Sequence, residues 1–410
     1  MKVLMSAYAC EPGKGSEPEV GWRVAIGMAE HCEMRVITRA NNRASIERAC
    51  AGMREPLPVF LYYDLPAVFL WLKRRLLGIG PYYVLWQMAI RWHFRKELKE
   101  ADLIHHVTFN GIQLPGFWVA TKTPVILGPL GGGMTCPAEL LPPCGRAKYR
   151  EILRTLLIRC LRFLPLWRWS IKSARVVIAA NRDTARLLQA HRKEPVEVRL
   201  ETGLTDEAVA VAPVARERGG KFRLLWLGHL IPRKAPILAL RAMAKALESD
   251  VGIELVIAGG GPDEEMLRAE AGRLGISGQV MFPGNVAKDQ VNRLMDDADA
   301  FIFTSIRDTS GNVVLEAMSR GLPVVTFWHQ GVREICDPGC AMCVEPASIG
   351  EVVDGLARAI VTLAGDRELA RRLGEAGRIK VATRLTWTNY CKATLEVYRS
   401  VHEVGAPPED

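Results

Sequence analysis

Short apolar runs alternate with amphipathic stretches along almost the whole chain. This alternation is typical of βα units, in which parallel strands are covered by helices. In the first half, the apolar runs predict strands over residues 3–8, 34–38, 59–63, 103–107, 124–127 and 176–179. In the second half, strands are predicted over 222–228, 253–258, 280–283, 300–304 and 323–327, and helices from about Pro236 and over 263–274, 288–297 and 312–320. The pattern predicts an α/β protein of two doubly wound, Rossmann-like halves that face each other across a cleft.

The boundary between these halves is predicted within residues 206–221, which are rich in Ala, Pro and charge and lack helical or strand periodicity. We therefore predict an N-terminal domain over 1–205, a connection over 206–221 and a C-terminal domain over 222–385. A C-terminal helix over 386–410 is expected to pack back on the N-terminal domain and to end in a short tail. Because open parallel sheets bind ligands at the carboxyl ends of their strands, the residues that follow each strand are the candidates for chemistry.

Composition narrows the class of protein. Hydrophobic residues make up 49% and charged residues 24% of the 410 residues, which indicates a folded chain with disorder only at the ends. The ten cysteines are scattered, which favours reduced thiols in the cytoplasm. Cys336, Cys340 and Cys343 lack a clear fourth ligand, so we expect loop cysteines and no metal site. No apolar run is long enough to span a bilayer, and the first residues lack the long apolar core of a signal peptide.

Cations cluster after the first strand of the second half, in the sequence GHLIPRKA. Gly228 allows a tight turn, and His229, Arg233 and Lys234 follow it. A nucleoside diphosphate that leaves during a reaction develops negative charge, which such cations stabilise. Arg offers a bidentate fork and Lys a point charge. The alternative is a solvated turn before a helix.

A second motif follows the strand over 300–304, in TSIRDTSGNVVLEAMSRGLPVV. Asp308 lies in a loop with Gly311, and the helix that follows begins at Asn312 and Val313, whose backbone N–H groups would form an anion site. Glu316, one turn into this helix, can accept two hydrogen bonds from ribose hydroxyls. The alternative is an ordinary half-exposed helix residue.

These motifs resemble the donor domain of the retaining GT-B glycosyltransferases of family 4, also called glycosyl transferases group 1. In that family two glutamates separated by seven residues hold the donor sugar and the ribose, and Asp308 and Glu316 have this spacing, with the shorter Asp first. The family's Arg and Lys pair resembles His229 and Lys234, and Arg233 stands beside Lys234 as a second source of a guanidinium. The resemblance implies transfer from a nucleoside-diphosphate sugar with retention of configuration, by front-face departure and attack. It implies no metal and no other cofactor.

The first half carries the residues that the resemblance places opposite the donor domain. A Gly-rich loop after the first strand, with Gly15 and Ser16, resembles the loop that approaches the donor phosphate. Glu19 either holds acceptor hydroxyls or begins a helix. Residues 128–133, in GPLGGG, are predicted to form a flexible acceptor loop that includes Gly131.

Adjacent histidines at a strand end are the candidates near the reacting sugar. His105 and His106 face opposite sides of the sheet, because neighbours on a strand alternate, so one is expected in the cleft and the other in the core. We favour His106 as the catalytic residue, together with Asp308 and Lys234. His105 and Asn110 are candidates on the acceptor side.

The net charge of +9 is concentrated in two segments of the first half. Residues 70–100 interleave cations with aromatic and aliphatic residues, and residues 146–175 hold nine Lys or Arg against the single acid Glu151. Basic amphipathic stretches suit an anionic lipid surface, where a lipid-linked acceptor would be found. The alternative is ordinary helices whose long cations extend to solvent. No nucleic-acid-binding motif accompanies the charge, so no nucleic-acid partner is expected.

The sequence therefore predicts a hexosyl transferase that uses a nucleotide sugar and a lipid-linked or polysaccharide-precursor glycan. We expect it in the cytoplasm, peripheral on the cytoplasmic face of the inner membrane. Two other functions fit the same fold: a nucleotide-sugar epimerase, and a non-catalytic, membrane-associated protein that binds sugar nucleotides.

Overall fold

The computed structural model describes residues 1–109, 111–119, 121–141, 145, 147–210 and 220–405. They form two compact units. Unit 1 is Met1–Gly133, Leu157–Thr202 and Trp387–Asp410, and unit 2 is Met134–Leu156 and Gly203–Thr386. The strands at 222–227 and beyond belong to unit 2 and the C-terminal helix belongs to unit 1, so the chain passes between the units more than once.

Unit 1 contains a seven-stranded sheet in the order β3-β2-β1-β4-β5-β6-β7, with every neighbouring pair parallel. Its strands are β1 Lys2–Ala7, β2 Glu33–Thr38, β3 Val59–Tyr62, β4 Leu103–Thr108, β5 Val125–Leu130, β6 Val176–Ala179 and β7 Val196–Val198. Its helices are α1 Ser16–Ala29, η1 Ala40–Asn42, α2 Arg43–Cys50, α3 Ala67–Leu72, η2 Lys73–Leu77, α4 Ile79–His93, α5 Arg95–Glu100, η5 Leu161–Phe163, α7 Pro165–Ser173, α8 Arg182–Gln189 and α17 Trp387–Gly405.

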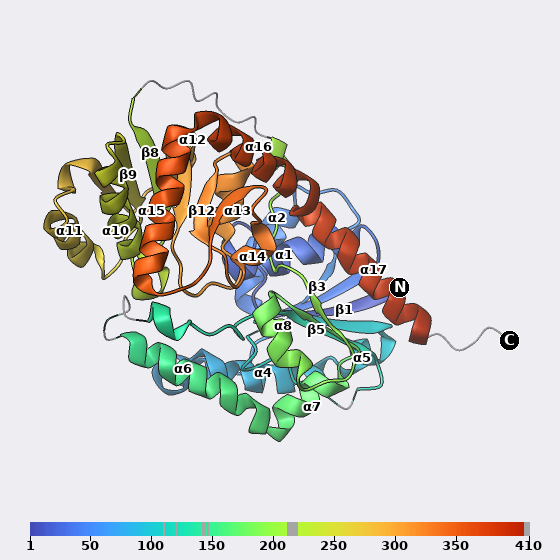
Figure 1. The fold of residues 1–410 in the computed structure, drawn as a ribbon. Helices are drawn as coiled ribbons and strands as arrows, with labels where there is room; N and C mark the ends of the chain where they lie inside the picture. The colour runs from blue at the N-terminus through green and yellow to red at the C-terminus, as the bar shows by residue number, and fades with distance from the viewer. Residues whose placement is uncertain (110, 120, 142–144, 146, 211–219, 406–410) are drawn as a thin grey trace. The chain divides into compact units, whose positions relative to one another are not determined.

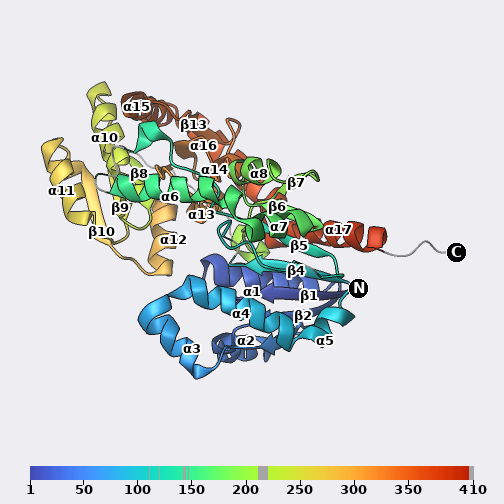
Figure 2. The same ribbon diagram turned by 90° about the horizontal axis from the view of Figure 1, so that it is seen from below.

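Two hydrophobic cores lie on opposite faces of this sheet, as strand alternation requires. Val3 and Met5 of β1 pack with α1 and α17, whereas Leu4 packs with α4 and α7. Figure 1 shows α17 beside α1 and above the strands, with α4 and α7 below them, and α4 and α7 face the viewer in Figure 2. The C-terminal helix therefore completes unit 1, with Tyr398 fully buried in its core.

Unit 2 contains a six-stranded parallel sheet in the order β10-β9-β8-β11-β12-β13. Its strands are β8 Phe222–Leu227, β9 Ile253–Ala258, β10 Val280–Gly284, β11 Ala300–Phe303, β12 Val324–Phe327 and β13 Ala341–Val344. Its helices are η3 Ala138–Leu140, the first part of α6 Lys148–Cys160, α9 Asp206–Ala210, η6 Pro232–Lys234, α10 Pro236–Ala246, η7 Leu247–Ser249, α11 Glu264–Arg273, η8 Ser277–Gln279, α12 Lys288–Asp297, α13 Asn312–Ser319, α14 Val332–Ile335, α15 Ile349–Gly365 and α16 Arg367–Arg384. Helices α10, α11 and α15 share one core with the sheet, and Figure 2 shows α12 on the side of the sheet away from α10.

The structure confirms the predicted fold class, because each unit is a parallel sheet covered by helices. It corrects the domain boundary. Residues 134–156 were predicted in the N-terminal domain but belong to unit 2, because Cys136 and Leu140 are buried in the core of unit 2.

The predicted connection also differs. Residues 206–210 form α9 within unit 2, with Val209 buried, whereas 211–219 lie outside the described residues. The backbone N–H of Leu204 donates to the carbonyl of Leu385 at 3.0 Å, so the chain enters and leaves unit 2 side by side.

No helix among the described residues is both long enough and apolar enough to cross a membrane.

Candidate functional site

In unit 2 the order of the strands reverses at β8. Strands β9 and β10 are added on one side of β8, and β11 is added on its other side, so that β8 and β11 are neighbours. Open α/β sheets bind ligands at this switch point, beyond the carboxyl ends of the strands. The two loops that leave here are joined by hydrogen bonds. The carbonyl of Arg233 accepts from the backbone N–H of Ile306 at 2.9 Å, and the carbonyl of Lys234 accepts from Thr304 Oγ1 at 3.0 Å. The sheet thus fixes the cations after β8 against the acidic loop after β11.

Lys234 and Asp308 form an ion pair between these loops. Both side chains are mostly buried, at 18% and 17% exposed. The Lys234 ammonium also lies 5.4 Å from the centroid of the Phe303 ring. Two residues 74 positions apart in sequence are thereby brought together.

His229 is exposed, and its ring is oriented by the neighbouring loop after β9. Nδ1 lies within hydrogen-bonding distance of the carbonyl oxygen of Gly260. A carbonyl only accepts, so Nδ1 carries the proton and Nε2 is left for another partner. A Cβ at Gly259 would lie 1.9 Å from the carbonyl oxygen of Gly228, so this glycine lets the two loops pack closely rather than holding a phosphate.

Asp308 is held from a third loop, after β12. Its backbone N–H donates to Gln330 Oε1 at 3.0 Å, and Gln330 Nε2 donates to the carbonyl of Thr135 at 2.8 Å. A Cβ at Gly331 would lie 1.9 Å from the carbonyl oxygen of Thr309, so only glycine permits this contact. Gln330 therefore positions Asp308. Gln330 was not predicted from the sequence.

The segment 134–156 also contributes charge to the site. Arg307 donates to both carboxylate oxygens of Glu151, at 2.8 and 3.0 Å. Arg233 Nη1 donates to the carbonyl of Arg307 at 3.3 Å. Arg154 lies near Arg307 and Arg233. Burial, as the larger cause, and the positive charges of these two residues lower the pKa of Arg154 to about 10. Three arginines, two of them on the loops that hold Lys234 and Asp308, therefore lie near one another.

Sequence reasoning missed Glu151, Arg154 and Arg307 as site residues because they are joined only by the fold. The one available signal was that Glu151 is the single acid in a strongly basic segment.

Glu316 lies on α13, whose N-terminus follows the same loop as Asp308. Gly311 caps the helix with φ +71°, a conformation that glycine adopts without strain. Asn312 and Val313, the first helical residues, are half-buried. The Glu316 side chain is 37% exposed, and Lys288 Nζ of α12 lies 3.9 Å from its carboxylate. At that distance the pair is not hydrogen-bonded, so the carboxylate can accept from a ligand.

In unit 1, the Gly-rich loop lies at the carboxyl end of β1. Gly15 caps α1 with φ +63°, and Ser16 is exposed with φ +48°. Glu19 accepts from the backbone N–H of Gly13 at 2.7 Å and from Arg23 Nε at 2.6 Å. These contacts give Glu19 the helix-start role rather than leaving it open toward an acceptor.

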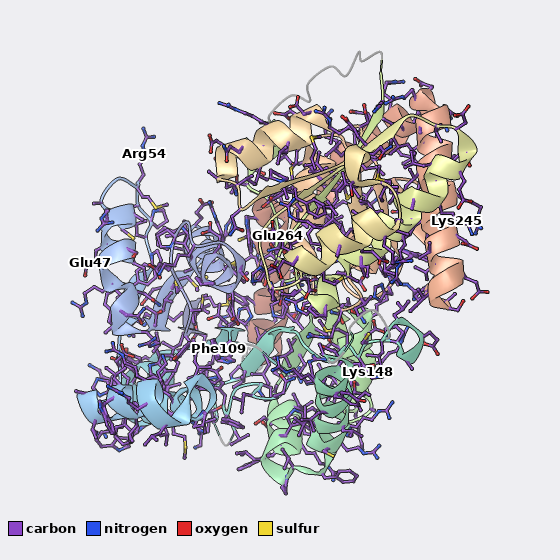
Figure 3. The ribbon with its side chains drawn as sticks, turned by 90° about the vertical axis from the view of Figure 1, so that its left-hand side faces the viewer. Glu47, Arg54, Phe109, Lys148, Lys245 and Glu264 are labelled. Carbon is purple, nitrogen blue, oxygen red and sulfur yellow. The ribbon has the colours of Figure 1, made fainter. Side chains whose placement is uncertain are left out.

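Phe109, labelled in Figure 3, follows β4 with φ +62°, and its backbone N–H donates to Glu17 of α1. Asn110 lies outside the described residues.

Both candidate histidines are fully buried on opposite faces of the sheet. His105 Nε2 donates to the carbonyl of Gly128 at 2.9 Å, and its Nδ1 accepts from the Tyr398 hydroxyl at 2.7 Å. Burial lowers the pKa of His105 to about 4 and that of His106 to about 3, so both rings are neutral at pH 7.

The predicted alternation of the pair is confirmed, but the expectation that one histidine points into an open site is wrong. The His106 ring lies against Tyr83, whose hydroxyl is 2.7 Å from Nε2, and near Trp118. These aromatic side chains close over it.

The expected flexible loop over 128–133 is also corrected. Gly128 to Leu130 are the last residues of β5, and Gly131 is buried in a bridge with Gly111. The carbonyl of Gly131 accepts from the backbone N–H of Ile112 at 2.9 Å. These backbone hydrogen bonds order the segment.

Residues 212–380 match the family model described as Glycosyl transferases group 1. An uncharacterized glycosyltransferase of Methanocaldococcus jannaschii is 30% identical over 182 residues, which are 44% of this chain and 45% of that protein. The GDP-mannose-dependent alpha-(1-6)-phosphatidylinositol monomannoside mannosyltransferase of Mycobacterium tuberculosis is 30% identical over 177 residues, 41% of this chain and 45% of that protein. The chain thus spans less than half the length of these curated relatives.

The likeness to solved structures extends over the whole fold. Alr3699/HepE of Anabaena, solved in complex with UDP, superposes with a TM-score of 0.61 at 18% identity, covering 98% of this chain and 100% of that one. The class that the two sheets define is a pair of Rossmann-like α/β units. Within that class the chain has the GT-B fold of the glycosyltransferases that it superposes on.

Proposed function

We propose that the chain is a retaining family 4 glycosyltransferase, which moves a hexosyl group from a nucleoside-diphosphate sugar to a lipid-linked or polysaccharide-precursor glycan. The observation that carries this proposal is the pairing of Lys234 and Asp308 at the switch point of unit 2, with Glu316 on the helix that follows. The match of residues 212–380 to the glycosyl transferase model supports it. So do relatives and solved neighbours whose names include GDP-mannose and UDP.

The leaving diphosphate is the first charge that the site must stabilise. Lys234 and Arg233 are fixed side by side by the hydrogen bonds of their carbonyls to the β11 loop. The backbone N–H groups at the start of α13 would donate further hydrogen bonds to the diphosphate. Arg154 and Arg307 raise the local positive potential behind them.

Asp308 changes partner when the donor binds. In the structure its carboxylate is neutralised by Lys234. A diphosphate carries more negative charge than one carboxylate and would draw the ammonium toward it. Asp308 is then free to accept hydrogen bonds from sugar hydroxyls, and Glu316 accepts from the ribose.

The reaction needs no nucleophile from the protein. The bond between the anomeric carbon and the phosphate oxygen breaks, and the acceptor oxygen bonds to the same face of that carbon. The acceptor proton passes to a phosphate oxygen of the departing diphosphate. Configuration is retained, and both atoms and charge balance.

A membrane location for the acceptor is supported by exposed apolar side chains on unit 1. Along α3, η2 and α4 these are Val68, Trp71, Leu76, Ile79, Leu85, Met88 and Trp92. Four more, Phe163, Leu164, Leu166 and Trp169, lie on η5 and α7, which cover the same face of the sheet. Large exposed apolar surfaces are often interaction sites, and the interleaved cations suit the anionic face of the cytoplasmic membrane.

Turnover of a panel of nucleotide sugars tests the proposal. Glu316→Ala should lower kcat/KM roughly 30- to 100-fold, because two hydrogen bonds to a carboxylate are lost. Glu368→Ala is the control, since Glu368 is 64% exposed on α16 and pairs with Arg371 in the same helix. The product of an α-configured donor should be an α-glycoside by NMR. Equal activity of Glu316→Ala and wild type would remove the ribose assignment.

A further inference from the structure

A cationic hollow lies in unit 1, and none of the residues proposed to bind the donor lines it. A cavity of about 390 Å³ is lined by Arg168 and Lys172 of α7 and by residues 190–194, the turn between α8 and β7. A second hollow of about 300 Å³ adjoins it, shares Lys172 and Glu194, and adds Lys122 and Arg175. Two elements distant in sequence thus form one concave, basic surface.

Its position separates it from the proposed chemistry. The second hollow includes Pro124, Val125 and Arg175, which stand at the amino ends of β5 and β6. The Gly-rich loop and Phe109 follow β1 and β4 at the opposite, carboxyl ends of the same parallel sheet. Ligands that react on such folds lie at the carboxyl ends, so this hollow serves another purpose.

The floor of the hollow is rigid because Arg192 is buried under it. Its guanidinium donates to the carbonyls of Ile171 and Ala174 at 3.1 and 3.3 Å, which satisfies carbonyls at the end of α7. The ring of His191 packs edge to face on buried Trp167, with centroids 5.3 Å apart. A binding surface here needs little ordering when a ligand arrives.

The cations around the floor are not matched by acids. Glu194 is the one carboxylate among the described residues that line either hollow, and it lies 3.7 Å from the buried Arg192. Arg168, Lys172 and Lys193 are exposed at the rim. Burial first, and then the positive charges of Arg168, Arg162 and Lys172, lower the pKa of His191. The cations therefore act on one another, and an anion would relieve their repulsion.

Stabilisation of the helix end does not account for this arrangement. Arg168 and Lys172 stand near the C-terminus of α7, where cations favour the helix dipole. That effect concerns one helix, however, and it explains neither Lys193 and Lys122 from other segments nor the concave shape.

The surroundings indicate what kind of anion fits. On α7, Leu166 and Trp169 are 45% and 50% exposed, and Phe163 and Leu164 precede them at 68% and 52%. A ligand with a phosphate group and an apolar body satisfies both features, whereas a free phosphate ion leaves the apolar side chains in water. Arg binds phosphate oxygens through a bidentate fork and Lys as a point charge.

We propose that this hollow binds the phosphate of an anionic membrane lipid and anchors unit 1 on the bilayer through α7. This lipid site rests on the membrane location proposed above and adds a binding site to it. The site does not depend on the transfer chemistry. The anchoring lipid is not the acceptor, because the hollow lies at the amino ends of the strands.

Sedimentation with vesicles tests this site on the full chain. Wild type is mixed with phosphatidylcholine vesicles with and without phosphatidylglycerol, and compared with Arg168→Gln/Lys172→Gln. We expect binding to the anionic vesicles to weaken roughly 30-fold in this variant, since each cation near a lipid surface contributes about 1 kcal/mol. The matched control is Lys392→Gln/Arg399→Gln, which removes the same charge from exposed positions of α17 on the other face of the sheet. The control should bind as wild type does.

Two further arms identify the ligand. The protein is titrated with inorganic phosphate and with short-chain phosphatidylglycerol below its micelle concentration, and tryptophan fluorescence reports binding. We expect the lipid to bind saturably, and phosphate either not to bind or to bind far more weakly. Equal loss in both double variants would overturn the proposal. So would phosphate binding as tightly as the lipid, or a wild type that ignores anionic vesicles. Turnover of a nucleotide sugar with a water-soluble acceptor should be unchanged in Arg168→Gln/Lys172→Gln. Failure of the proposed transferase function would appear in this turnover assay, whereas failure of the lipid site would appear in the vesicle assay.

Discussion

Single side chains at the candidate site are held in place by a few named partners. Lys234 and Asp308 form an ion pair in which both side chains are mostly buried. Asp308, one methylene shorter than the glutamate of the family that the motif resembles, is brought to its place by Gln330 and by the close approach that Gly331 permits. The backbone of Asp308 is therefore fixed by the loop after β12.

The buried histidines make the first prediction, which concerns pH. Because the pKa values of His105 and His106 in the folded chain, about 4 and about 3, lie below the ordinary 6.5, each favours folding above pH 6.5 and loses this contribution as the pH falls toward 4. From pH 7 to pH 5 each histidine should cost about 2 kcal/mol of unfolding free energy. Urea unfolding at the two pH values measures the loss. Resonances assigned to His105 or His106 that titrate near pH 6.5 in the folded protein would contradict the burial of these rings.

The positions of candidate residues could be predicted from the sequence where a motif follows a strand, whereas their roles stay predictions. Lys234, Asp308 and Glu316 follow this rule, because the carboxyl ends of parallel strands share one edge. Glu151, Arg154 and Arg307 break it, because a segment of the first half packs on the second sheet. Burial of both histidines depends on α4 and α17, whose packing no local pattern specifies.

Among the elements, the segment 134–156 does the most to shape the site. It binds the loop after β11 through Glu151 and the loop after β12 through Thr135. Both loops carry residues that hold Asp308. The segment is thus a brace for the candidate donor site rather than part of the N-terminal domain.

The second prediction concerns this brace and belongs to the scale of elements. Glu151→Gln leaves Arg307 without its carboxylate, and both side chains are mostly buried, at 12% and 18% exposed. We expect a loss of about 1–3 kcal/mol of unfolding free energy, together with weaker donor binding. Glu375→Gln, which disrupts a more exposed ion pair within α16, should cost less than about 0.5 kcal/mol. Denaturant titration of the two variants compares them, and equal losses would mean that the brace has no special role.

Strands inside the sheets were predicted well, since long apolar runs mark strands that are covered on both faces. The strands over 176–179 and 253–258 begin and end as predicted. The edge strands β7 and β13 were missed because both are short, and β7 is interrupted by a glutamate. The expectation of loop cysteines is wrong for Cys343, which lies in β13.

At the scale of the whole molecule, charge and apolar surface are distributed unevenly. The net charge of +9 is concentrated on segments of unit 1 that also expose large apolar side chains. Unit 2 also holds a group of partly buried cations, among which are Lys234 and Arg307. One unit is therefore suited to a surface and the other to a small anionic ligand.

The most direct test of the donor site is calorimetric titration with UDP, GDP and ADP. We expect at least one of them to bind wild type in a 1:1 ratio, and Lys234→Ala to weaken that binding about tenfold or more, because a charge-assisted hydrogen bond to the diphosphate is removed. Lys245→Ala is the matched control, since Lys245 pairs with Asp354 at the surface of the same unit and should bind as wild type does. Two results would contradict the assignment of Lys234 to the diphosphate site. Either none of the three nucleoside diphosphates binds wild type, or Lys234→Ala binds one of them as tightly as wild type does.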